Sequence, residues 1–343
     1  MYDKFIRDNI KHGSFKLVHP NGDEQIYGNG QASIVWKIND TRVLSKIVRN
    51  PLLNLGETYI EGGWDVEDGK LAELLTVLRT NFEDGFVRRG AMAAYAAILQ
   101  SWNNIGASMR NVSHHYDLDA SLFRAFLDQD MHYSCAYFRS PDQPLEEAQS
   151  AKCDHIRRKL CLKPGQKVLD IGSGWGSLGL YLADKEDVQV TGLTLSNEQL
   201  AVANKEAVRR GLDNQVQFRL EDYRNHHGKY DAVVSVGMFE HVGPKNYQTY
   251  FRVLRSVLEA DGIFLLHTIG AGEGGYVTDR WIEKYIFPNG VLPPPQAIVN
   301  PCEGLFTIED WHNIGADYDP TLMAWFHNFS DAWPSLKDRY SER

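Results

Sequence analysis

The chain has 343 residues, more than one average domain, and its 43% hydrophobic and 24% charged composition is that of a globular protein with a buried core. Its formal net charge is −9 and its pI is about 5.7, which argues against nucleic acid as the main partner because phosphate binding needs a basic face. The first fifty residues are nevertheless net positive, so a local basic surface remains open there.

The N-terminal third predicts a small domain of strands followed by helices. Residues 1 to about 50 alternate apolar and polar positions, as in 14–18 and 32–38, with a turn-rich segment at 20–23 between them. Period two with such punctuation predicts short strands and hairpins. Residues 71–100 then carry apolar side chains at three- and four-residue spacing, which predicts helices. We therefore expect an α+β domain over 1–102 and a polar linker over 103–119.

The C-terminal part, 120–343, predicts an α/β domain. Short apolar strands and amphipathic helices alternate from about residue 165, which is typical of a parallel sheet covered by helices on both faces. The expected strands are 167–171, 188–193, 216–219, 231–236 and 262–267. The expected helices between them are 177–184, 198–210 and 248–258.

A glycine-rich loop follows the first of these strands. Its predicted ligand contacts are Asp170, Gly172, Ser173, Gly174, Trp175 and Gly176. A dinucleotide would favour the spacing G-x-G-x-x-G, and the acid at the strand tip would repel its diphosphate. A P-loop would need Gly-Lys-Ser or Gly-Lys-Thr, which is absent. S-adenosylmethionine carries a sulfonium, an amino group and no phosphate, so the loop favours it and a Rossmann-like class I methyltransferase fold.

Two later segments fit the same ligand. Glu221 and Asp222 end the third strand, where they could meet the adenine amine. The second strand ends in Thr194, Leu195 and Ser196 with Gln199 just beyond, where most methyltransferases of this fold have an acid that grips the ribose. We expect these residues to complete the cofactor site. The absence of the usual acid narrows the choice of methyltransferase family.

Several separated motifs resemble those of the cyclopropane fatty acid synthases, which methylenate cis double bonds of unsaturated acyl chains. The match extends from about Tyr133 to Phe326. It comprises segments 132–138, 170–176, 192–196, 237–243, 266–270 and 313–318. The N-terminal domain is similar, more weakly, to the lipid-associated domain of the bacterial phospholipid-acting enzymes. The resemblance adds Tyr133 and Ser134 to the expected cofactor contacts.

The resemblance also implies a catalytic set that binds bicarbonate. After methyl transfer to the alkene, a base must remove a proton from the new methyl group so that the ring can close. By resemblance that base is bicarbonate. It would be held by the side chains of Glu240, His267 and Tyr318 and the backbone amides of Cys135 and Ile269. Bicarbonate beside a carboxylate requires a shared proton, and the sequence leaves open where that proton resides.

Three rival functions remain open at this point. A small-amine N-methyltransferase of similar fold would not need the bicarbonate set, so Cys135, Tyr318 and the N-terminal domain favour a lipid substrate. A fatty acid C-methyltransferase would leave a methyl or methylene branch, and the complete base set favours ring closure instead. A lipid-binding homologue with impaired catalysis is the third, because the chain ends early relative to the family.

The sequence also leads to expectations about metal sites, cellular location and assembly. The four cysteines form no metal spacing and we expect no metal site and no disulfide. The N-terminus lacks the apolar core of a signal peptide, and there is no uninterrupted run of about 18 apolar residues. We therefore expect a cytoplasmic protein, peripherally associated with the inner membrane face, whose partners are unsaturated phospholipid acyl chains. Family resemblance suggests a homodimer.

Overall fold

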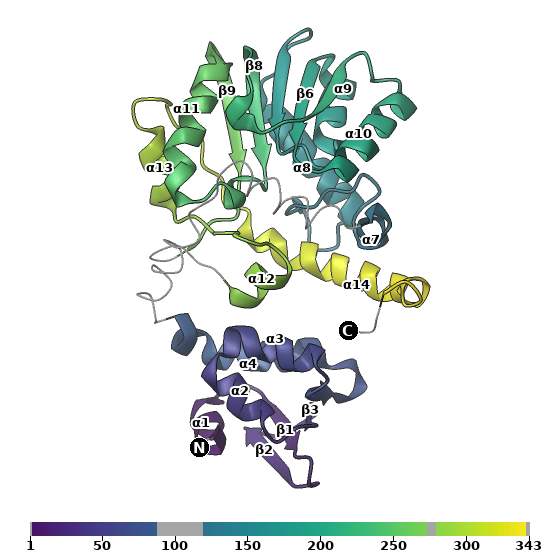
Figure 1. Ribbon diagram of the computed structural model, residues 1–343, viewed down its shortest axis with the longest axis vertical. Helices are drawn as coiled ribbons and strands as arrows, with labels where there is room; N and C mark the ends of the chain where they lie inside the picture. The colour runs from purple at the N-terminus through teal and green to yellow at the C-terminus, as the bar shows by residue number, and fades with distance from the viewer. Residues whose placement is uncertain (1, 88–118, 273–278, 341–343) are drawn as a thin grey trace. The chain divides into compact units, whose positions relative to one another are not determined.

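A computed structural model describes residues 2–87, 119–272 and 279–340. These residues form two compact units (Figure 1). The larger contains 119–272 and 288–340; the smaller contains 2–87 together with 279–287. The predicted helical run near 90–100 and the predicted linker at 103–119 fall almost wholly outside the described residues. The predicted domain limits there stay predictions.

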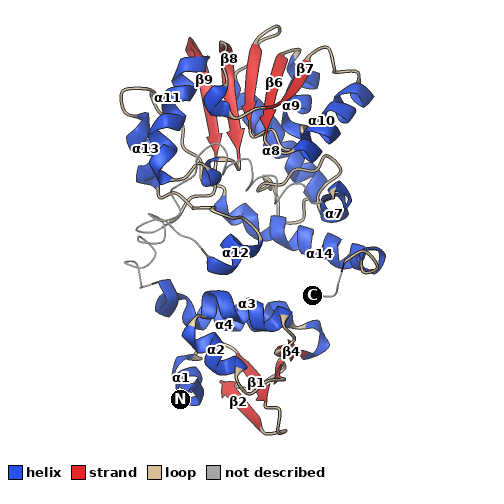
Figure 2. Ribbon diagram, in the orientation of Figure 1, coloured by secondary structure: helices blue, strands red, loops and turns tan. Residues whose placement is uncertain are grey.

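The larger unit is built on a five-stranded parallel sheet, which confirms the predicted α/β class (Figure 2). Its strands are β5 (Lys167–Ile171), β6 (Gln189–Thr194), β7 (Val216–Leu220), β8 (Tyr230–Val236) and β9 (Leu258–His267). Its helices are α7 (Ala120–Phe126), α8 (Leu145–Leu160), α9 (Ser177–Glu186), α10 (Asn197–Arg210), α11 (Tyr247–Val257), α13 (Pro295–Cys302) and α14 (Tyr318–Leu336).

Two apolar cores bury the two faces of this sheet. Helices α8, α9 and α10 cover one face around Leu180, Val190 and Phe218. Helices α11 and α13 cover the other around Leu169, Tyr250 and Phe251. Because both faces are covered, strand β5 is buried from Val168 to Ile171 and shows no alternation of buried and exposed positions.

The strand order places the expected site. The strands are arranged β7-β6-β5-β8-β9, so the chain moves outward in one direction from β5 and then returns to its other side at β8. Parallel sheets bind ligands at such a switch point, outside the carboxyl ends of the strands. The glycine loop follows β5 at this point, and Thr194, Glu221 and His267 end or follow the neighbouring strands at the same edge.

The smaller unit has a mixed sheet in the order β2-β1-β3-β4. Its strands are β1 (Ser14–Val18), β2 (Glu24–Gly28), β3 (Val35–Ile38) and β4 (Trp64–Val66). Its helices are α1 (Tyr2–Asn9), α2 (Val43–Arg49), α3 (Pro51–Ile60), α4 (Leu71–Val87) and α12 (Arg280–Tyr285). An aromatic core of Phe15, Tyr27, Trp36 and Trp64 joins sheet and helices.

Two features of the smaller unit differ from the predicted strands and hairpins over residues 1–50. The terminal residues fold as α1, and the segment after β3 folds as α2, because its apolar residues Val43, Leu44 and Ile47 face the core at helical spacing. Helix α12 comes from far along the chain and packs on α3, where Tyr285 Oη donates to Glu57 Oε1 at 2.9 Å and Lys284 pairs with the same carboxylate.

Candidate functional site

The glycine loop makes the tight turn that its sequence predicts. Gly172, Gly174 and Gly176 have φ of +82°, +53° and +89°, a region that residues with a Cβ rarely enter. The amides of Gly172 and Ser173 both donate to the carbonyl of Leu193 at the end of β6, at 3.0 and 2.8 Å. The loop is thereby fixed between β5 and β6.

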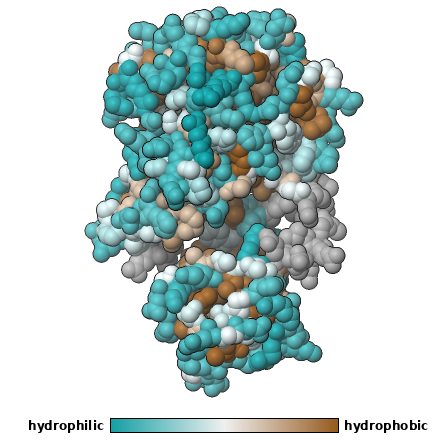
Figure 3. Space-filling model, turned by 180° about the vertical axis from the view of Figure 1, so that it is seen from behind, coloured by the Kyte–Doolittle hydropathy of each residue, from teal (hydrophilic) through white to brown (hydrophobic). Residues whose placement is uncertain are grey.

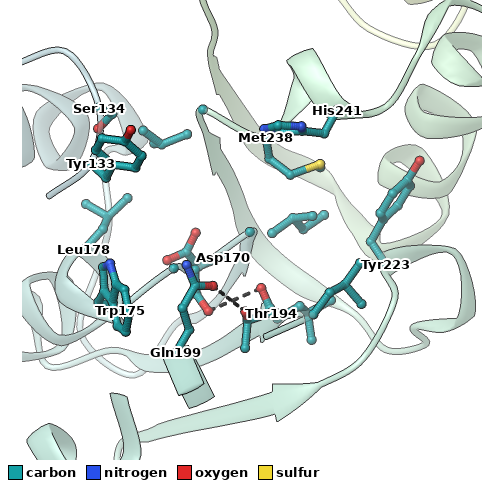
Figure 4. A pocket seen from close by; sticks show the side chains of 18 of the residues that line it. Tyr133, Ser134, Asp170, Trp175, Leu178, Thr194, Gln199, Tyr223, Met238 and His241 are labelled. Carbon is teal, nitrogen blue, oxygen red and sulfur yellow. Dashed lines mark hydrogen bonds between the residues drawn. The ribbon is translucent and has the colours of Figure 1, made fainter. Parts of the chain in front are cut away.

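A pocket opens beside this loop, and we call it the glycine-loop pocket. Figure 4 shows Asp170, Thr194 and Gln199 close together, with Met238 and His241 across the pocket from Tyr133 and Ser134. The predicted cofactor residues that line it are Tyr133, Ser134, Asp170, Gly172, Ser173, Gly174, Trp175, Thr194, Leu195, Gln199, Glu221 and Asp222.

Gly176 and Ser196 are the predicted contacts that do not line the pocket. Gly176 immediately precedes α9, and a Cβ there would lie 2.6 Å from Phe218 Cζ and 2.8 Å from Ala203 Cβ. Ser196 is buried at the start of α10, where its Oγ accepts from the backbone amide of Gln199 at 3.2 Å. Both residues therefore support the residues that line the pocket without lining it themselves.

Three carboxylates of the pocket differ in their environments. Burial raises the pKa of Asp170 to about 7, and its Oδ2 has no hydrogen-bond partner among the described residues. Asp222 instead accepts from the backbone and side chain of Arg224 at 2.6–2.9 Å. Glu221 Oε1 lies 3.1 Å from His226 Nδ1. Of these three carboxylates, Asp170 is the one with a buried oxygen left without a partner among the described residues.

The predicted catalytic residues lie beside the pocket rather than along its lining. Glu240 is buried in a short turn after β8, between the lining residues Met238 and His241. Its Oε1 accepts from the amide of Ile269 at 2.7 Å, so two predicted members of the set are in direct contact. Burial raises the pKa of Glu240, and its Oε2 has no partner among the described residues.

His267 ends β9, in register with Val236 of β8. Its Nδ1 is buried and has no partner among the described residues. Burial, together with the positive charge of Lys152, lowers the pKa of His267 to about 4. The imidazole is therefore neutral at physiological pH. Like Glu240 Oε2, its Nδ1 is a buried polar atom without a hydrogen-bond partner among the described residues.

The low pKa of His267 makes stability depend on pH. Unfolded histidine takes up a proton as pH falls below about 6.5, whereas the native side chain resists it until about 4, so stability is lost across that window as pH falls. We expect His267→Asn to reduce the loss of unfolding free energy between about pH 7.5 and pH 5 by up to about 2 kcal/mol, measured in urea. Exposed His227→Asn is the control; an identical pH dependence in wild type and His267→Asn would contradict the assignment.

Cys135 and Tyr318 approach each other through a contact between two distant segments. Ala136 N donates to Thr321 Oγ1 at 3.1 Å, and Phe138 N donates to Asp317 Oδ2 at 3.1 Å. Tyr318 is the first residue of α14. Burial raises the pKa of the Cys135 thiol to about 11, so the thiol is not poised as a nucleophile and a backbone role fits it better.

Thr321, which the sequence analysis did not select, fixes this contact. It is fully buried, accepts from Ala136 N and donates to the carbonyl of Asp317 at 2.6 Å. We expect Thr321→Val to cost about 1–3 kcal/mol of unfolding free energy, because it leaves a buried amide without an acceptor in nearly the same volume. Thr321→Ser keeps the hydroxyl and should recover most of that loss in urea unfolding; equal losses would exclude the hydrogen bond as the cause.

The sequence analysis also missed a cluster of buried polar side chains around Lys152 of α8. Lys152 lines the pocket and donates to Ser134 Oγ at 2.7 Å. His132 lies 2.8 Å from Asp128 Oδ2 and 3.1 Å from Cys153 Sγ. Burial alone would lower the pKa of His132, but Cys153 and Asp128 outweigh it and raise the value to about 9. A signal existed: Lys152 falls on the helical stripe of Leu145, Gln149, Ile156 and Leu160, where a charge is unexpected.

Comparison with known proteins shows which sequences the chain resembles. Residues 104–343 match the family described as mycolic acid cyclopropane synthetase, and residues 1–89 match a domain family of unknown function, DUF7884. The chain is 44% identical to the cyclopropane-fatty-acyl-phospholipid synthase of Escherichia coli strain K12 over 92% of its own length and 81% of that protein's. It is 33% identical to a probable fatty acid methyltransferase of Pseudomonas putida over 86% of this chain and 75% of that one.

Solved structures agree. The mycolic acid cyclopropane synthase CmaA1, complexed with SAH and CTAB, superposes with a TM-score of 0.64 and 33% sequence identity. The superposition covers 68% of this chain and 87% of that one. The coclaurine N-methyltransferase structure, at 22% identity and a TM-score of 0.63, shares the fold.

Proposed function

The chain belongs to the mycolic acid cyclopropane synthetase family of S-adenosylmethionine-dependent methyltransferases, and on that premise we propose that it converts cis double bonds of phospholipid acyl chains into cyclopropane rings, with bound bicarbonate as the base. Family membership supports methyl transfer from S-adenosylmethionine and a lipid acceptor. The bicarbonate, the phospholipid and the ring product are the parts we propose.

One observation carries the proposal: two buried polar atoms without partners lie at the ends of adjacent strands. Glu240 Oε2 follows β8 and His267 Nδ1 ends β9, and neither has a hydrogen-bond partner among the described residues. A buried polar atom left unpaired costs about 1–3 kcal/mol, so such a pair is retained where a ligand completes it. A small planar oxyanion that both accepts and donates a proton, such as bicarbonate, matches a protonated carboxyl beside a neutral imidazole.

The electrostatics of Glu240 support this fit. A carboxylate would repel an anion, but burial raises the pKa of Glu240, which favours the protonated form that donates a hydrogen bond. The amide of Ile269, which now donates to Glu240 Oε1, would orient that carboxyl and keep its second oxygen directed at the ligand. Tyr318 and the Cys135 amide would complete the set from the α14 side.

These residues then divide the work of ring formation. The residues that would hold S-adenosylmethionine, the donor of the methyl group, are Asp170, Trp175, Thr194, Gln199, Glu221 and those of the glycine loop. The burial of Glu240 and His267 would keep water, which would otherwise trap the carbocation left on the acyl chain after methyl transfer, away from the base. Bound bicarbonate would supply the base that takes a proton from the new methyl group. Glu240 and His267 would hold that base in place and share its proton.

The bicarbonate step has a direct test. Turnover with vesicles of cis-unsaturated phospholipid should fall several-fold or more in buffer purged of carbon dioxide and recover when bicarbonate is added, with formate at equal ionic strength as the control anion. Turnover that is indifferent to bicarbonate would rule out its role as base. That result would not count against cofactor binding or methyl transfer.

We further propose that the smaller unit docks on the bilayer surface. It exposes large apolar side chains, its first fifty residues are net positive although the unit as a whole is net negative, and Figure 3 shows apolar areas on its surface. These side chains are Phe5, Ile26, Val48, Leu52, Tyr59 and Leu75. Apolar area combined with basic charge is the recognised basis for interfacial binding to anionic lipid. The described part of the chain contains no helix long and apolar enough to cross a membrane.

Docking predicts that the full chain co-sediments with anionic vesicles and less with neutral ones, and that Leu52→Glu with Tyr59→Glu weakens the association. Unchanged sedimentation of this double variant would exclude the surface. A cytoplasmic location remains an expectation from the sequence and a homodimer remains one from the family; analytical ultracentrifugation measures the oligomeric state.

A second candidate function is fatty acid C-methylation, favoured by the likeness to the probable fatty acid methyltransferase of Pseudomonas putida. It would use the same cofactor site and the same lipid, and would end with a branch rather than a ring. The two functions differ in the fate of the alkene and of the transferred hydrogens.

A further inference from the structure

Lys152 places a buried amine at the edge of the glycine-loop pocket. The residue is 3% exposed, lies in the middle of α8 and is one of the pocket's lining residues. Its Nζ donates to Ser134 Oγ at 2.7 Å. Burial of the ammonium lowers the pKa of Lys152, the direction expected of a charge with too little compensation.

No carboxylate among the described residues lies within 4.0 Å of Lys152 Nζ, although its electrostatic neighbours include Asp128. Asp128 is engaged by His132, whose raised pKa keeps the imidazole protonated at neutral pH. The Asp128 carboxylate is therefore matched by another cation, and the other groups that favour a charged Lys152 are the thiols of Cys153 and Cys135. Burial therefore disfavours the ammonium form of Lys152, and an anion bound beside Nζ would stabilise that form, so the cluster is suited to receive an anion.

The hydrogen bond to Lys152 also sets the polarity of Ser134. An ammonium group has three donors and no acceptor, so Ser134 Oγ must accept from it. The hydroxyl hydrogen of Ser134 is then directed at another acceptor. The carbonyl of Ser134 accepts from Gln149 Nε2 at 3.0 Å, one helical turn before Lys152, so α8 holds this residue at two points.

We propose that Lys152 is a positioning residue for a carboxylate-type oxyanion in the glycine-loop pocket: it orients the hydroxyl of Ser134, already an expected cofactor contact, toward the anion and supplies the counter-charge. Two ligands of this family carry that chemistry. One is the methionine carboxylate of S-adenosylmethionine. The other is bicarbonate, and that source rests on the function proposed above. Lys152 lies near enough to both regions for its charge to lower the pKa of His267 and to oppose the rise at Cys135.

Binding of two nucleosides separates the sources without requiring turnover. S-adenosylhomocysteine carries the amino-acid carboxylate, and 5′-methylthioadenosine lacks the whole amino-acid tail. For Lys152→Met we expect the affinity for S-adenosylhomocysteine to fall about tenfold or more in calorimetry, as for a lost charge-assisted hydrogen bond, and the affinity for methylthioadenosine to change less than about twofold. Lys185→Met, at an exposed position of α9, is the matched control.

Bicarbonate is the source instead if both nucleosides bind normally and the bicarbonate concentration for half-maximal turnover rises about tenfold. The proposal is overturned if neither the nucleoside preference nor the bicarbonate dependence changes, or if both nucleosides weaken equally. That second result would mark Lys152 as merely structural. A structural role also predicts a lower Tm for the unliganded variant, whereas removing an under-compensated buried charge should leave the Tm equal or higher.

Ser134→Ala gives an independent reading should Lys152→Met fold poorly. It should shift the same preference between the two nucleosides, and its effect should not add to that of Lys152→Met, because the two side chains act through one contact. Full additivity in the double variant would contradict this coupling.

Discussion

Glu240→Gln is expected to abolish ring formation while leaving the cofactor bound. The amide has nearly the same shape, so its oxygen can still accept from Ile269 N, which Glu240 Oε1 contacts at 2.7 Å. It cannot take up or release the proton that the base must share. Losing a proton-transfer group typically costs about a hundredfold or more in rate, so cyclopropane product should fall by at least that factor in mass spectra of extracted lipid.

The affinity for S-adenosylhomocysteine should change less than about twofold in the same variant, because Glu240 lies beside the glycine-loop pocket rather than along it. Glu259→Gln makes the same chemical change at an exposed position at the start of β9 and should behave as wild type. Full ring formation by Glu240→Gln would show that the bicarbonate site has been assigned to the wrong residues.

The second large effect is expected from Gly172→Ala in the glycine loop. Gly172 has φ of +82°, and a Cβ there would lie 2.8 Å from both Cβ and Cγ of Met238. The backbone conformation alone costs a residue with a Cβ about 1–2 kcal/mol. The side chain of Met238 must also move, and this changes the pocket because both residues line it. We expect the affinity for S-adenosylhomocysteine to fall about tenfold or more in calorimetry, with a Tm lower by several degrees.

Gly165→Ala separates backbone strain from the contact. Gly165 has nearly the same φ, +81°, but a Cβ there would have open space around it, outside the pocket. It should lower the Tm through the same backbone cost and leave cofactor affinity unchanged. Equal affinity in Gly172→Ala and Gly165→Ala would mean that the loop does not hold the cofactor as proposed.

The sequence predicted the parallel sheet and the position of the pocket because those features depend on local patterns. An apolar strand, a glycine-rich turn and an amphipathic helix follow one another within about twenty residues from Lys167. Each expected strand of the larger unit is present, with β9 beginning earlier than expected, at Leu258. The residues at the carboxyl ends of these strands therefore meet as the topology requires.

What could not be predicted depends on contacts between distant segments. Nothing near Arg280–Tyr285 indicates that α12 packs on α3, and nothing near Thr321 indicates that its hydroxyl accepts from Ala136. The environment of Glu240 was left open for the same reason. Its pKa is raised by burial, and two distant parts of the chain contact it: Ile269 N donates to its Oε1 at 2.7 Å and Val291 N donates to its carbonyl at 2.9 Å.

Ring closure by methylene transfer is tested most directly with S-adenosylmethionine trideuterated at its methyl group, bicarbonate and vesicles of cis-unsaturated phospholipid. We predict that each modified acyl chain gains one carbon, retains two of the three deuterium atoms and no longer contains an alkene, as read by lipid mass spectrometry before and after catalytic hydrogenation. A product that keeps all three deuterium atoms, or that still takes up hydrogen, would contradict cyclopropanation and identify the protein as a fatty acid C-methyltransferase.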